Sequence, residues 1–295
     1  MKELLVLSGK GGTGKTSITG SFAVLCKNAM LVDCDVDASD LHLLLSPEVQ
    51  ERHDFISGVT AKVNPEACTG CGTCSTICHF EAISMTEDEI ALVDPLACEG
   101  CAVCAHFCPD DAIVLHPNHC GFWYFSETDY GPMVHAELKP GEENSGKLVS
   151  LVKQKARELA EEMAIDIMLV DGPPGIGCPV IASVSGANLI LVITEPTQSG
   201  LHDLERVLGL ARHFKVEACV CINKWELNEE MAVRIEQFCK GQSVPVVGKV
   251  PFDKTVVESL VQGQPVVKYK DCNASKSIAN IWSAVSKMLT QEEQK

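Results

Sequence analysis

Near its start the chain carries a glycine-rich segment that fits the pattern G-x-x-x-x-G-K-S/T: Ser8-Gly9-Lys10-Gly11-Gly12-Thr13-Gly14-Lys15-Thr16. An apolar run at residues 4–7 precedes this segment and predicts a buried strand, while apolar residues at helical spacing follow it over residues 15–28. Strand, glycine-rich turn and helix N-terminus form the context in which this pattern binds phosphate. The segment therefore predicts a phosphate-binding loop.

The residue types of this loop suggest a role for each position. Backbone N–H groups of the glycine turn and the dipole of the following helix attract phosphate oxygens. Lys15 is expected to reach the β- and γ-phosphates of a nucleotide, and the Thr16 hydroxyl is expected to bind Mg²⁺. The predicted nucleotide contacts in the loop are Gly9, Lys10, Gly11, Gly12, Thr13, Gly14, Lys15 and Thr16.

Acidic residues follow two further apolar runs that predict strands. Residues 29–32 end at Asp33, with Asp35 close behind, and residues 167–170 end at Asp171. The carboxyl ends of parallel strands border the crevice in which open α/β sheets bind ligands. We expect Asp171 to hold Mg²⁺ through water, as in the Walker B arrangement.

A second lysine, Lys10, makes the loop more specific, since Gly-Lys-Gly-Gly-x-Gly-Lys-Thr resembles the deviant Walker A motif of the MinD/ParA/Mrp group of P-loop ATPases. The resemblance implies a dimer formed on ATP binding, in which Lys10 reaches the phosphates held by the partner. It also implies that Asp35, in switch I, helps to position the attacking water or metal, with Asp33 closer to the phosphate loop and Mg²⁺. The alternative is that these aspartates only cap the start of the loop. In switch II, the backbone N–H of Gly175 would sense the γ-phosphate. The catalytic residues expected on this basis are Lys10, Lys15, Asp35 and Asp171.

The segment Asn223-Lys224-Trp225-Glu226 bears on which base is bound. It resembles the Asn-Lys-x-Asp motif that reads guanine in GTPases, but Glu226 is one methylene longer than the expected aspartate. The deviant Walker A group also has an asparagine here, which bonds adenine, so ATP is the predicted nucleotide. The segment Val250-Pro251-Phe252-Asp253 resembles the base-edge loop of that group, which places Pro251 and Asp253 against adenine.

Two runs of four cysteines, offset by 30 residues, form an internal repeat of the spacing C-x2-C-x2-C-x3-C. This spacing resembles that of bacterial two-cluster ferredoxins, in which the fourth cysteine of one run binds the cluster of the other. The resemblance implies one [4Fe–4S] cluster on Cys68, Cys71, Cys74 and Cys108, and a second on Cys98, Cys101, Cys104 and Cys78.

Zinc is the weaker alternative, because zinc sites take four ligands as two pairs, unlike two complete runs in tandem. His79 stands where the ferredoxin pattern has a proline after the fourth cysteine. We expect His79 to lie beside a cluster or at the surface, and a ligand role is the less favoured interpretation. The other cysteines are interpreted as core residues, with Cys219 and Cys221 pointing to opposite faces of one strand rather than forming a metal pair.

The overall composition excludes some classes of function. Sixteen cysteines without a secretion signal favour metal or redox chemistry over a disulfide framework, and we expect a cytoplasmic protein. A formal net charge of −16 argues against nucleic acid as a partner. No apolar run approaches membrane-spanning length, and the acidic end of the chain, residues 290–295, is poorly matched to anionic lipid, so no stable membrane anchor is expected.

Alternating strand and helix patterns predict an α/β fold with a mostly parallel sheet flanked by helices. Further strands are expected at 189–194, 218–223 and 246–250, and helices at 147–163, 201–214 and 229–240. The predicted organisation is a discontinuous P-loop ATPase domain, residues 1–59 and 117–295, with an inserted small α+β ferredoxin-like domain, residues 60–116.

The insert lies between Asp35 and Asp171, so movement coupled to the γ-phosphate would reach it. The leading hypothesis is therefore a Mg²⁺-dependent ATPase that forms a homodimer, or a heterodimer with a related ATPase, and controls electron transfer from two [4Fe–4S] clusters to a redox partner. One alternative is a carrier or scaffold for Fe–S cluster assembly. Another is a MinD-like spatial regulator in which the clusters are only structural.

Overall fold

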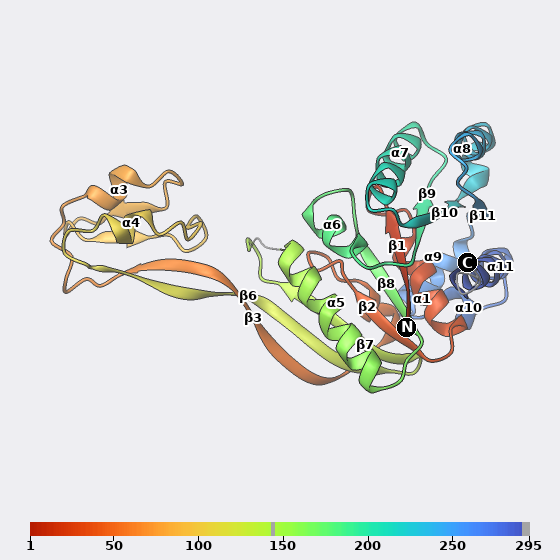
Figure 1. Cartoon of the computed structure of the whole chain (residues 1–295), viewed down its shortest axis with the longest axis horizontal. Helices are drawn as coiled ribbons and strands as arrows, with labels where there is room; N and C mark the ends of the chain where they lie inside the picture. The colour runs from red at the N-terminus through yellow and green to blue at the C-terminus, as the bar shows by residue number, and fades with distance from the viewer. Residues whose placement is uncertain (143–144, 291–295) are drawn as a thin grey trace. The chain divides into compact units, whose positions relative to one another are not determined.

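The chain, seen in a computed structural model that describes residues 1–142 and 145–290, divides into two units (Figure 1). Unit 1 comprises Met1–His53, Trp123–Glu137 and Ser145–Lys295, and unit 2 comprises Asp54–Phe122 and Leu138–Asn144. Unit 2 contains all eight cysteines of the two runs. The insert bounds expected from the sequence, 60–116, stay a prediction.

The strands of unit 1 belong to a sheet that has nine strands within the described residues, in the order β11-β10-β9-β1-β8-β2-β7-β6-β3. Neighbours from β11 to β7 are parallel. The expected α/β fold with a mostly parallel sheet is therefore confirmed. The strands are β1 (Lys2–Ser8), β2 (Ala29–Asp33), β3 (Glu48–Val63), β6 (Ile113–Thr128), β7 (Gly131–Leu138), β8 (Ile167–Pro174), β9 (Leu189–Thr194), β10 (Glu217–Asn223) and β11 (Val246–Val250).

Helices cover both faces of this sheet (Figure 1). On one face lie α1 (Lys15–Leu25), α2 (Leu41–Leu45), α10 (Val266–Tyr269) and α11 (Asn273–Thr290). On the other lie α5 (Ser145–Glu162), α6 (Cys178–Val184) and α7 (Gln198–His213). The remaining helices of unit 1 are η1 (Trp225–Asn228), α8 (Glu229–Gly241) and α9 (Lys254–Val261).

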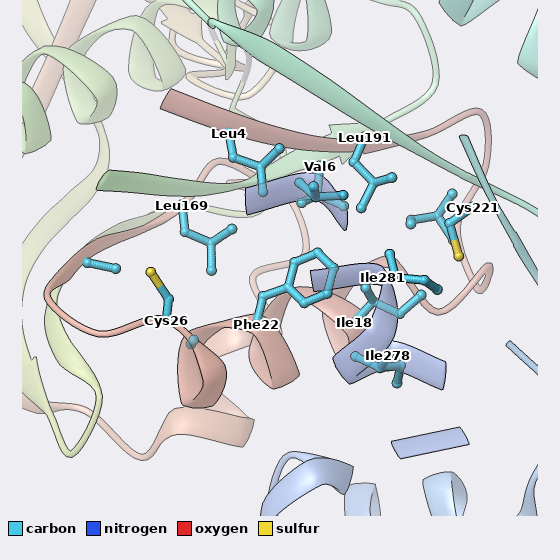
Figure 2. Packing of buried hydrophobic residues seen from close by; sticks show 14 of the residues in the cluster. Leu4, Val6, Ile18, Phe22, Cys26, Leu169, Leu191, Cys221, Ile278 and Ile281 are labelled. Carbon is cyan, nitrogen blue, oxygen red and sulfur yellow. The ribbon is translucent and has the colours of Figure 1, made fainter. Parts of the chain in front are cut away.

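The core between the sheet and α1 follows from the side-chain periods of its elements (Figure 2). Leu4 and Val6 of β1 point to this face, because residues two apart on a strand share a face. They meet Phe22 of α1 and Ile281 of α11, while the alternate residues of β1 pack against the other helical layer. Because both faces of the central strands are buried, their sequences are continuous apolar runs.

The two cysteines of β10, Cys219 and Cys221, both belong to this core. Their interpretation as core residues is therefore confirmed. The expectation that they point to opposite faces was wrong, since two residues separated by one position lie on the same side of a strand.

Three strands of the large sheet were not predicted from the sequence: β3, β6 and β7. Residues 122–125, which are all aromatic, lie within β6. Two residues, Asp129 and Tyr130, join β6 to β7, and a two-residue connection between neighbouring strands makes an antiparallel hairpin. The extra strands extend the sheet beyond β2.

Unit 2 contains two short helices, α3 (Thr73–Ile77) and α4 (Val103–His106), and the strands β4 (Ile83–Met85) and β5 (Ala91–Val93). The two strands pair antiparallel, with Ile83 opposite Val93. The small core of the unit consists of Ala61, Cys74, Ile83, Ala91, Cys104 and Ile113. Cysteines thus form part of the interior itself.

Across residues 1–142 and 145–290, no helix has the length and apolar character needed to cross a bilayer. Residues 291–295, which entered the argument against a membrane anchor, lie outside the described residues.

Candidate functional site

The glycine-rich loop connects the end of β1 to the start of α1, as the sequence pattern predicts. Two of its glycines, Gly12 and Gly14, have φ angles of 77° and 86°, in the left-handed region that favours glycine. A Cβ atom at Gly14 would also lie 2.4 Å from Nδ2 of Asn223. Both the turn and the close approach of Asn223 therefore require glycine at position 14.

A cavity of about 750 Å³ opens at this loop, within the size range of small-molecule sites. The expected residues that line it are Gly11, Gly12, Thr13, Gly14, Lys15, Thr16, Asp35, Asn223, Pro251 and Asp253. The lining does not include five others from the predicted site: Gly9, Lys10, Asp33, Asp171 and Gly175. Much of the remaining wall is apolar and comes from α2 and α9, with Leu43, Leu44, Val256, Val257 and Leu260.

Asp171, at the carboxyl end of β8, links the residues that the phosphate motif needs. Its Oδ2 lies 2.9 Å from Lys15 Nζ and accepts a hydrogen bond of 2.8 Å from the Thr16 hydroxyl. The Thr19 hydroxyl donates to Oδ1 at 2.8 Å. Burial lowers the pKa of Lys15, but the carboxylates of Asp171, Asp33 and Asp35 outweigh that effect and raise it, so Lys15 is charged.

The surroundings of the Thr13 hydroxyl indicate which kind of ligand the cavity suits. Its Oγ1 atom is buried and has no hydrogen-bond partner among the described residues. The residue lines the cavity beside the charged Lys15. A hydroxyl donor and an ammonium group on a glycine turn at a helix N-terminus suit an anionic, oxygen-rich ligand.

Asp33 is fully buried and serves as an anchor for the loop that follows β2. Its Oδ1 accepts from the Asp35 backbone N–H at 3.0 Å, and its Oδ2 accepts from the Ser39 hydroxyl at 2.7 Å and the Leu41 N–H at 3.2 Å. Burial, reinforced by the charge of Asp171, raises the pKa of Asp33 to about 7. Asp35 lies on the cavity wall, 4.0 Å from Lys15 Nζ, and burial raises its pKa to about 6.

Lys10 is half-exposed and contacts residues after β9. Its Nζ lies 3.5 Å from Glu195 Oε2 and 3.5 Å from the Ser199 hydroxyl. Glu195 Oε1 also pairs with Lys224 Nζ at 2.6 Å, and the same amine donates to the Gly12 carbonyl at 3.1 Å. The sequence analysis missed Glu195 and Lys224 as parts of the site. The position of Glu195 directly after a buried strand, like that of Asp33 and Asp171, was the signal available.

Two further groups bond protein atoms of the loop. The Gly175 N–H, expected to sense phosphate, donates to the Ser8 carbonyl at 3.0 Å. The Asn223 amide donates to the Thr13 carbonyl at 2.7 Å. Both therefore contact the loop itself.

The base-edge loop is held by two carboxylates. Glu226 Oε2 accepts from the Phe252 N–H at 2.7 Å, and the Asp253 side chain caps α9 by accepting from the Thr255 N–H at 2.9 Å. Pro251 and Asp253 still line the cavity. Glu226 thus sets the position of the segment that the sequence analysis placed against adenine.

In unit 2, each set of four cysteines assigned to one cluster lines one cavity. The first has a volume of about 20 Å³ and is lined by Cys68, Cys71, Cys74 and Cys108, and the second also has about 20 Å³ and is lined by Cys78, Cys98, Cys101 and Cys104. Each cavity thus combines three cysteines of one run with the fourth of the other. His79 is not among the lining residues of either cavity.

All sixteen cysteines lie in the described part of the chain and are free thiols. Within that part, no three His, Cys, Asp or Glu side chains converge where a single metal ion would bind. Four thiols spread around a cavity of this kind suit a cluster in which each cysteine binds a different iron, rather than one ion held at bonding distance by all four.

The chain was compared with known proteins. The model of the CobQ/CobB/MinD/ParA nucleotide-binding domain family matches residues 4–266. The chain is 34% identical over 290 residues to the uncharacterized protein MJ0578 of Methanocaldococcus jannaschii, with 97% of each protein covered.

Two solved structures show a similar fold. The septum site-determining protein MinD of Pyrococcus horikoshii, complexed with Mg-ADP, matches with a TM-score of 0.60 and 17% identity over 100% of this chain and 99% of that one. A MinC:MinD cell division protein complex of Aquifex aeolicus matches with a TM-score of 0.58 and 19% identity over 97% and 96%. From the family match and the similarity over nearly the whole length of MJ0578, we conclude that the chain belongs to the CobQ/CobB/MinD/ParA nucleotide-binding domain family.

Proposed function

We propose that this protein is a Mg²⁺-dependent ATPase whose nucleotide state controls electron transfer from two [4Fe–4S] clusters to a redox partner. The observation that carries the proposal is the convergence of Lys15, Thr16 and Asp171 at the phosphate loop of a chain that also has two four-cysteine cavities. The first arrangement suits a nucleotide switch, and the second supplies what the switch would act on.

The residues at and near the cavity would have different roles in ATP hydrolysis. Lys15 and the loop N–H groups would bind the β- and γ-phosphates, and Thr16, Asp33 and Asp171 would hold Mg²⁺ directly or through water. Asp35, on the cavity wall, would orient the attacking water. Mg²⁺ would neutralise charge that develops on the phosphate oxygens. The Mg-ADP in the structurally similar MinD of Pyrococcus horikoshii supports this ligand.

Adenine is favoured over guanine by the hydrogen bond of Glu226. Its Oε2 accepts from the Phe252 N–H at 2.7 Å, so this carboxylate holds the base-edge loop. Reading guanine needs a carboxylate at this position with both oxygens free for the base. Asn223 donates one amide N–H to the Thr13 carbonyl, and its second amide N–H would remain for adenine. Backbone groups around Pro251 would then contact the base edge.

The cysteine cavities support the cluster part of the proposal. Each is lined by four thiol side chains, three from one run and one from the other, and none of these cysteines forms a disulfide. When bound, [4Fe–4S] clusters supply one-electron redox chemistry. The cysteines would hold them as thiolates, and the small core of unit 2 would keep water from much of their surface.

A chain of contacts leads from the loop after β2 to β6, the strand that follows the second cysteine run along the chain. Ser39, which bonds Asp33, also lies 3.5 Å from His42 Nδ1. His42 stacks on His135 of β7, with ring centroids 6.2 Å apart, and His135 bonds the Ser126 hydroxyl of β6 at 3.0 Å. Along the chain, β6 begins at Ile113, five residues after Cys108. A change in the loop after β2 would therefore act on β6 through two histidine rings.

A homodimer, or a heterodimer with a related ATPase, follows from the role of Lys10. The Lys10 amine is half-exposed, and its contacts with Glu195 and Ser199 of the same subunit are long, at 3.5 Å each. ATP binding would therefore free this amine to reach the phosphates held by a partner. A redox partner with a basic surface would complement the net charge of −16. Sixteen free thiols favour a reducing compartment, which supports a cytoplasmic location.

A MinD-like spatial regulator with structural clusters is the second candidate, supported by the fold similarity to septum site-determining proteins. Measurements on the anaerobically purified protein distinguish the redox proposal from the spatial regulator. Iron and sulfide analysis, EPR of the reduced protein and ATP turnover should show about eight irons per chain, two interacting clusters and Mg²⁺-dependent hydrolysis, as two four-iron clusters require. Absence of iron, or turnover without redox-active clusters, would overturn the redox proposal and favour the regulator.

A further inference from the structure

The two cysteine cavities are related by the 30-residue repeat but differ in the side chains beside their cysteines. The first cavity is lined by Thr69 and Thr73, and the equivalent positions of the second are Glu99 and Val103. The backbone around the second position is alike in the two repeats, since Gly72 and Ala102 have φ angles of 70° and 64° and each precedes a short helix. Thr73 and Val103 are thus closely matched sites, and their side chains differ by a hydroxyl in place of a methyl group.

The Thr73 hydroxyl lies beside a predicted cluster ligand. Its Oγ1 is 3.5 Å from Sγ of Cys71, within hydrogen-bond distance for sulfur. The Ala112 N–H also donates to Sγ of Cys108 in this cavity at 3.3 Å. If Cys71 binds a cluster as a thiolate, the hydroxyl becomes the donor to sulfur. Val103 has no hydroxyl and can make no such bond to Cys101.

Charge does not account for a difference between the cavities in the same way. Each lining contains one carboxylate residue, Asp110 in the first and Glu99 in the second. The Asp110 carboxylate accepts a hydrogen bond of 2.6 Å from Thr69. Since each cavity has one carboxylate residue, the Thr73 hydroxyl is the difference that lies beside a ligand sulfur.

We propose that the Thr73 hydroxyl makes the two cluster sites inequivalent, raising the reduction potential at the site of Cys68, Cys71, Cys74 and Cys108 above that of the other site. Hydrogen bonds to the sulfurs of a cluster are among the factors that set its potential, because they stabilise the more negative, reduced state. In the singly reduced protein the electron then resides at the site that contains Thr73. This inference rests on the proposed function, since it requires both clusters to be present.

An EPR-monitored redox titration of the anaerobically purified full chain tests this role, with dithionite as reductant. The wild type should be reduced in two steps. Thr73→Val, which keeps the shape and removes the hydroxyl, should shift the higher-potential step downward, so that the two steps approach each other. Thr73→Ser, which keeps the hydroxyl, should retain the wild-type separation. Val103→Thr should shift the lower-potential step upward.

Iron and sulfide content separates failure of this inference from failure of the proposed function. A wild type without two clusters would overturn the function. Two clusters with potentials that Thr73→Val leaves unchanged, or a shift of the lower step instead, would overturn the inference alone. If Thr73→Val does not assemble its clusters, Val103→Thr decides: an upward shift of the lower step supports the inference, and no shift contradicts it.

Discussion

Lys15 Nζ and Asp171 Oδ2 lie 2.9 Å apart at the base of the phosphate loop, and the two side chains are 6% and 1% exposed. This ion pair joins α1 to β8 and keeps Lys15 charged inside the protein. A nucleotide phosphate would take Asp171's place as the partner of Lys15, and Mg²⁺ would take the place of Lys15 beside Asp171. Binding thus exchanges one ion pair for two.

Replacing Lys15 by methionine should therefore both abolish nucleotide binding and destabilise the protein. The change leaves three carboxylates, Asp171, Asp33 and Asp35, near one another with no cation between them. Removing one partner of a buried pair costs about 3–5 kcal/mol. Urea unfolding and calorimetric titration with Mg·ATP measure the two effects. Lys10→Met is the matched control, since the half-exposed Lys10 should change unfolding by less than about 1 kcal/mol.

The stability of the nucleotide-free protein should fall as the pH rises from about 4 to about 7. Burial raises the pKa of Asp33 from an ordinary 3.8 to about 7, and that of Asp35 to about 6. Over this window the folded state holds protons that the unfolded state has lost, so the free energy of unfolding decreases with increasing pH. Asp33→Asn should flatten the dependence in urea unfolding between pH 4.5 and 8. Equal slopes for both proteins would refute the assignment.

The stacked pair of His42 and His135 should carry the response of β6 to nucleotide. Burial lowers the pKa of His135 to about 4, so its ring is neutral and can bond the Ser126 hydroxyl at ordinary pH. His135→Phe keeps an aromatic ring but loses this bond. It should leave ATP affinity within about twofold of wild type, since a single hydrogen bond far from the ligand is changed, and reduce the effect of ATP on the clusters.

A control for this variant lies on the same strands. His53 stacks on Trp123 with ring centroids 4.1 Å apart but is half-exposed and does not contact His42 or His135 in the described contacts. His53→Phe should preserve nucleotide coupling. A loss of coupling in both variants would mean that the strands, rather than the histidine pair, transmit the signal.

The Glu226 carboxylate should position the base-edge loop rather than read guanine. Glu226→Ala removes the acceptor of the Phe252 N–H, and a hydrogen bond to a charged group contributes about 1.5–3 kcal/mol. ATP binding should weaken about tenfold or more, and Glu226→Gln, which keeps an oxygen acceptor, should recover most of the affinity. Fluorescence titration with ATP and GTP measures this. Preferential GTP binding by the wild type would contradict it.

The parts of the site that could be predicted from the sequence are those encoded by residues close together. The strand, glycine turn and helix around Lys15 are such a case. Cys68 and Cys108 are far apart in the chain, and it was the resemblance of the two runs to two-cluster ferredoxins that grouped them before the structure placed them on one cavity wall. Pairs such as Lys10 and Glu195 are far apart in the chain, and no local pattern links them.

The edge strand β3 was missed for a different physical reason. Residues 48–54 of β3 are almost entirely polar and exposed, and Val49 and Ile56 are exposed as well, so the alternation that indicates a half-buried strand is absent. An edge strand in contact with one neighbour needs little apolar surface. The pairing along the sheet, rather than side-chain burial, makes these residues a strand.

The central claim, that nucleotide state controls the clusters, is tested most directly by measuring cluster reduction potentials with different nucleotides. An EPR-monitored redox titration of the full chain should be run with Mg·ADP and with Mg·ATP, the latter on Asp35→Ala to prevent turnover. We predict that at least one cluster has a different potential in the two states, and that His135→Phe removes the difference. Identical potentials with Mg·ADP and Mg·ATP, in a protein shown to bind both nucleotides and to carry both clusters, would contradict the account.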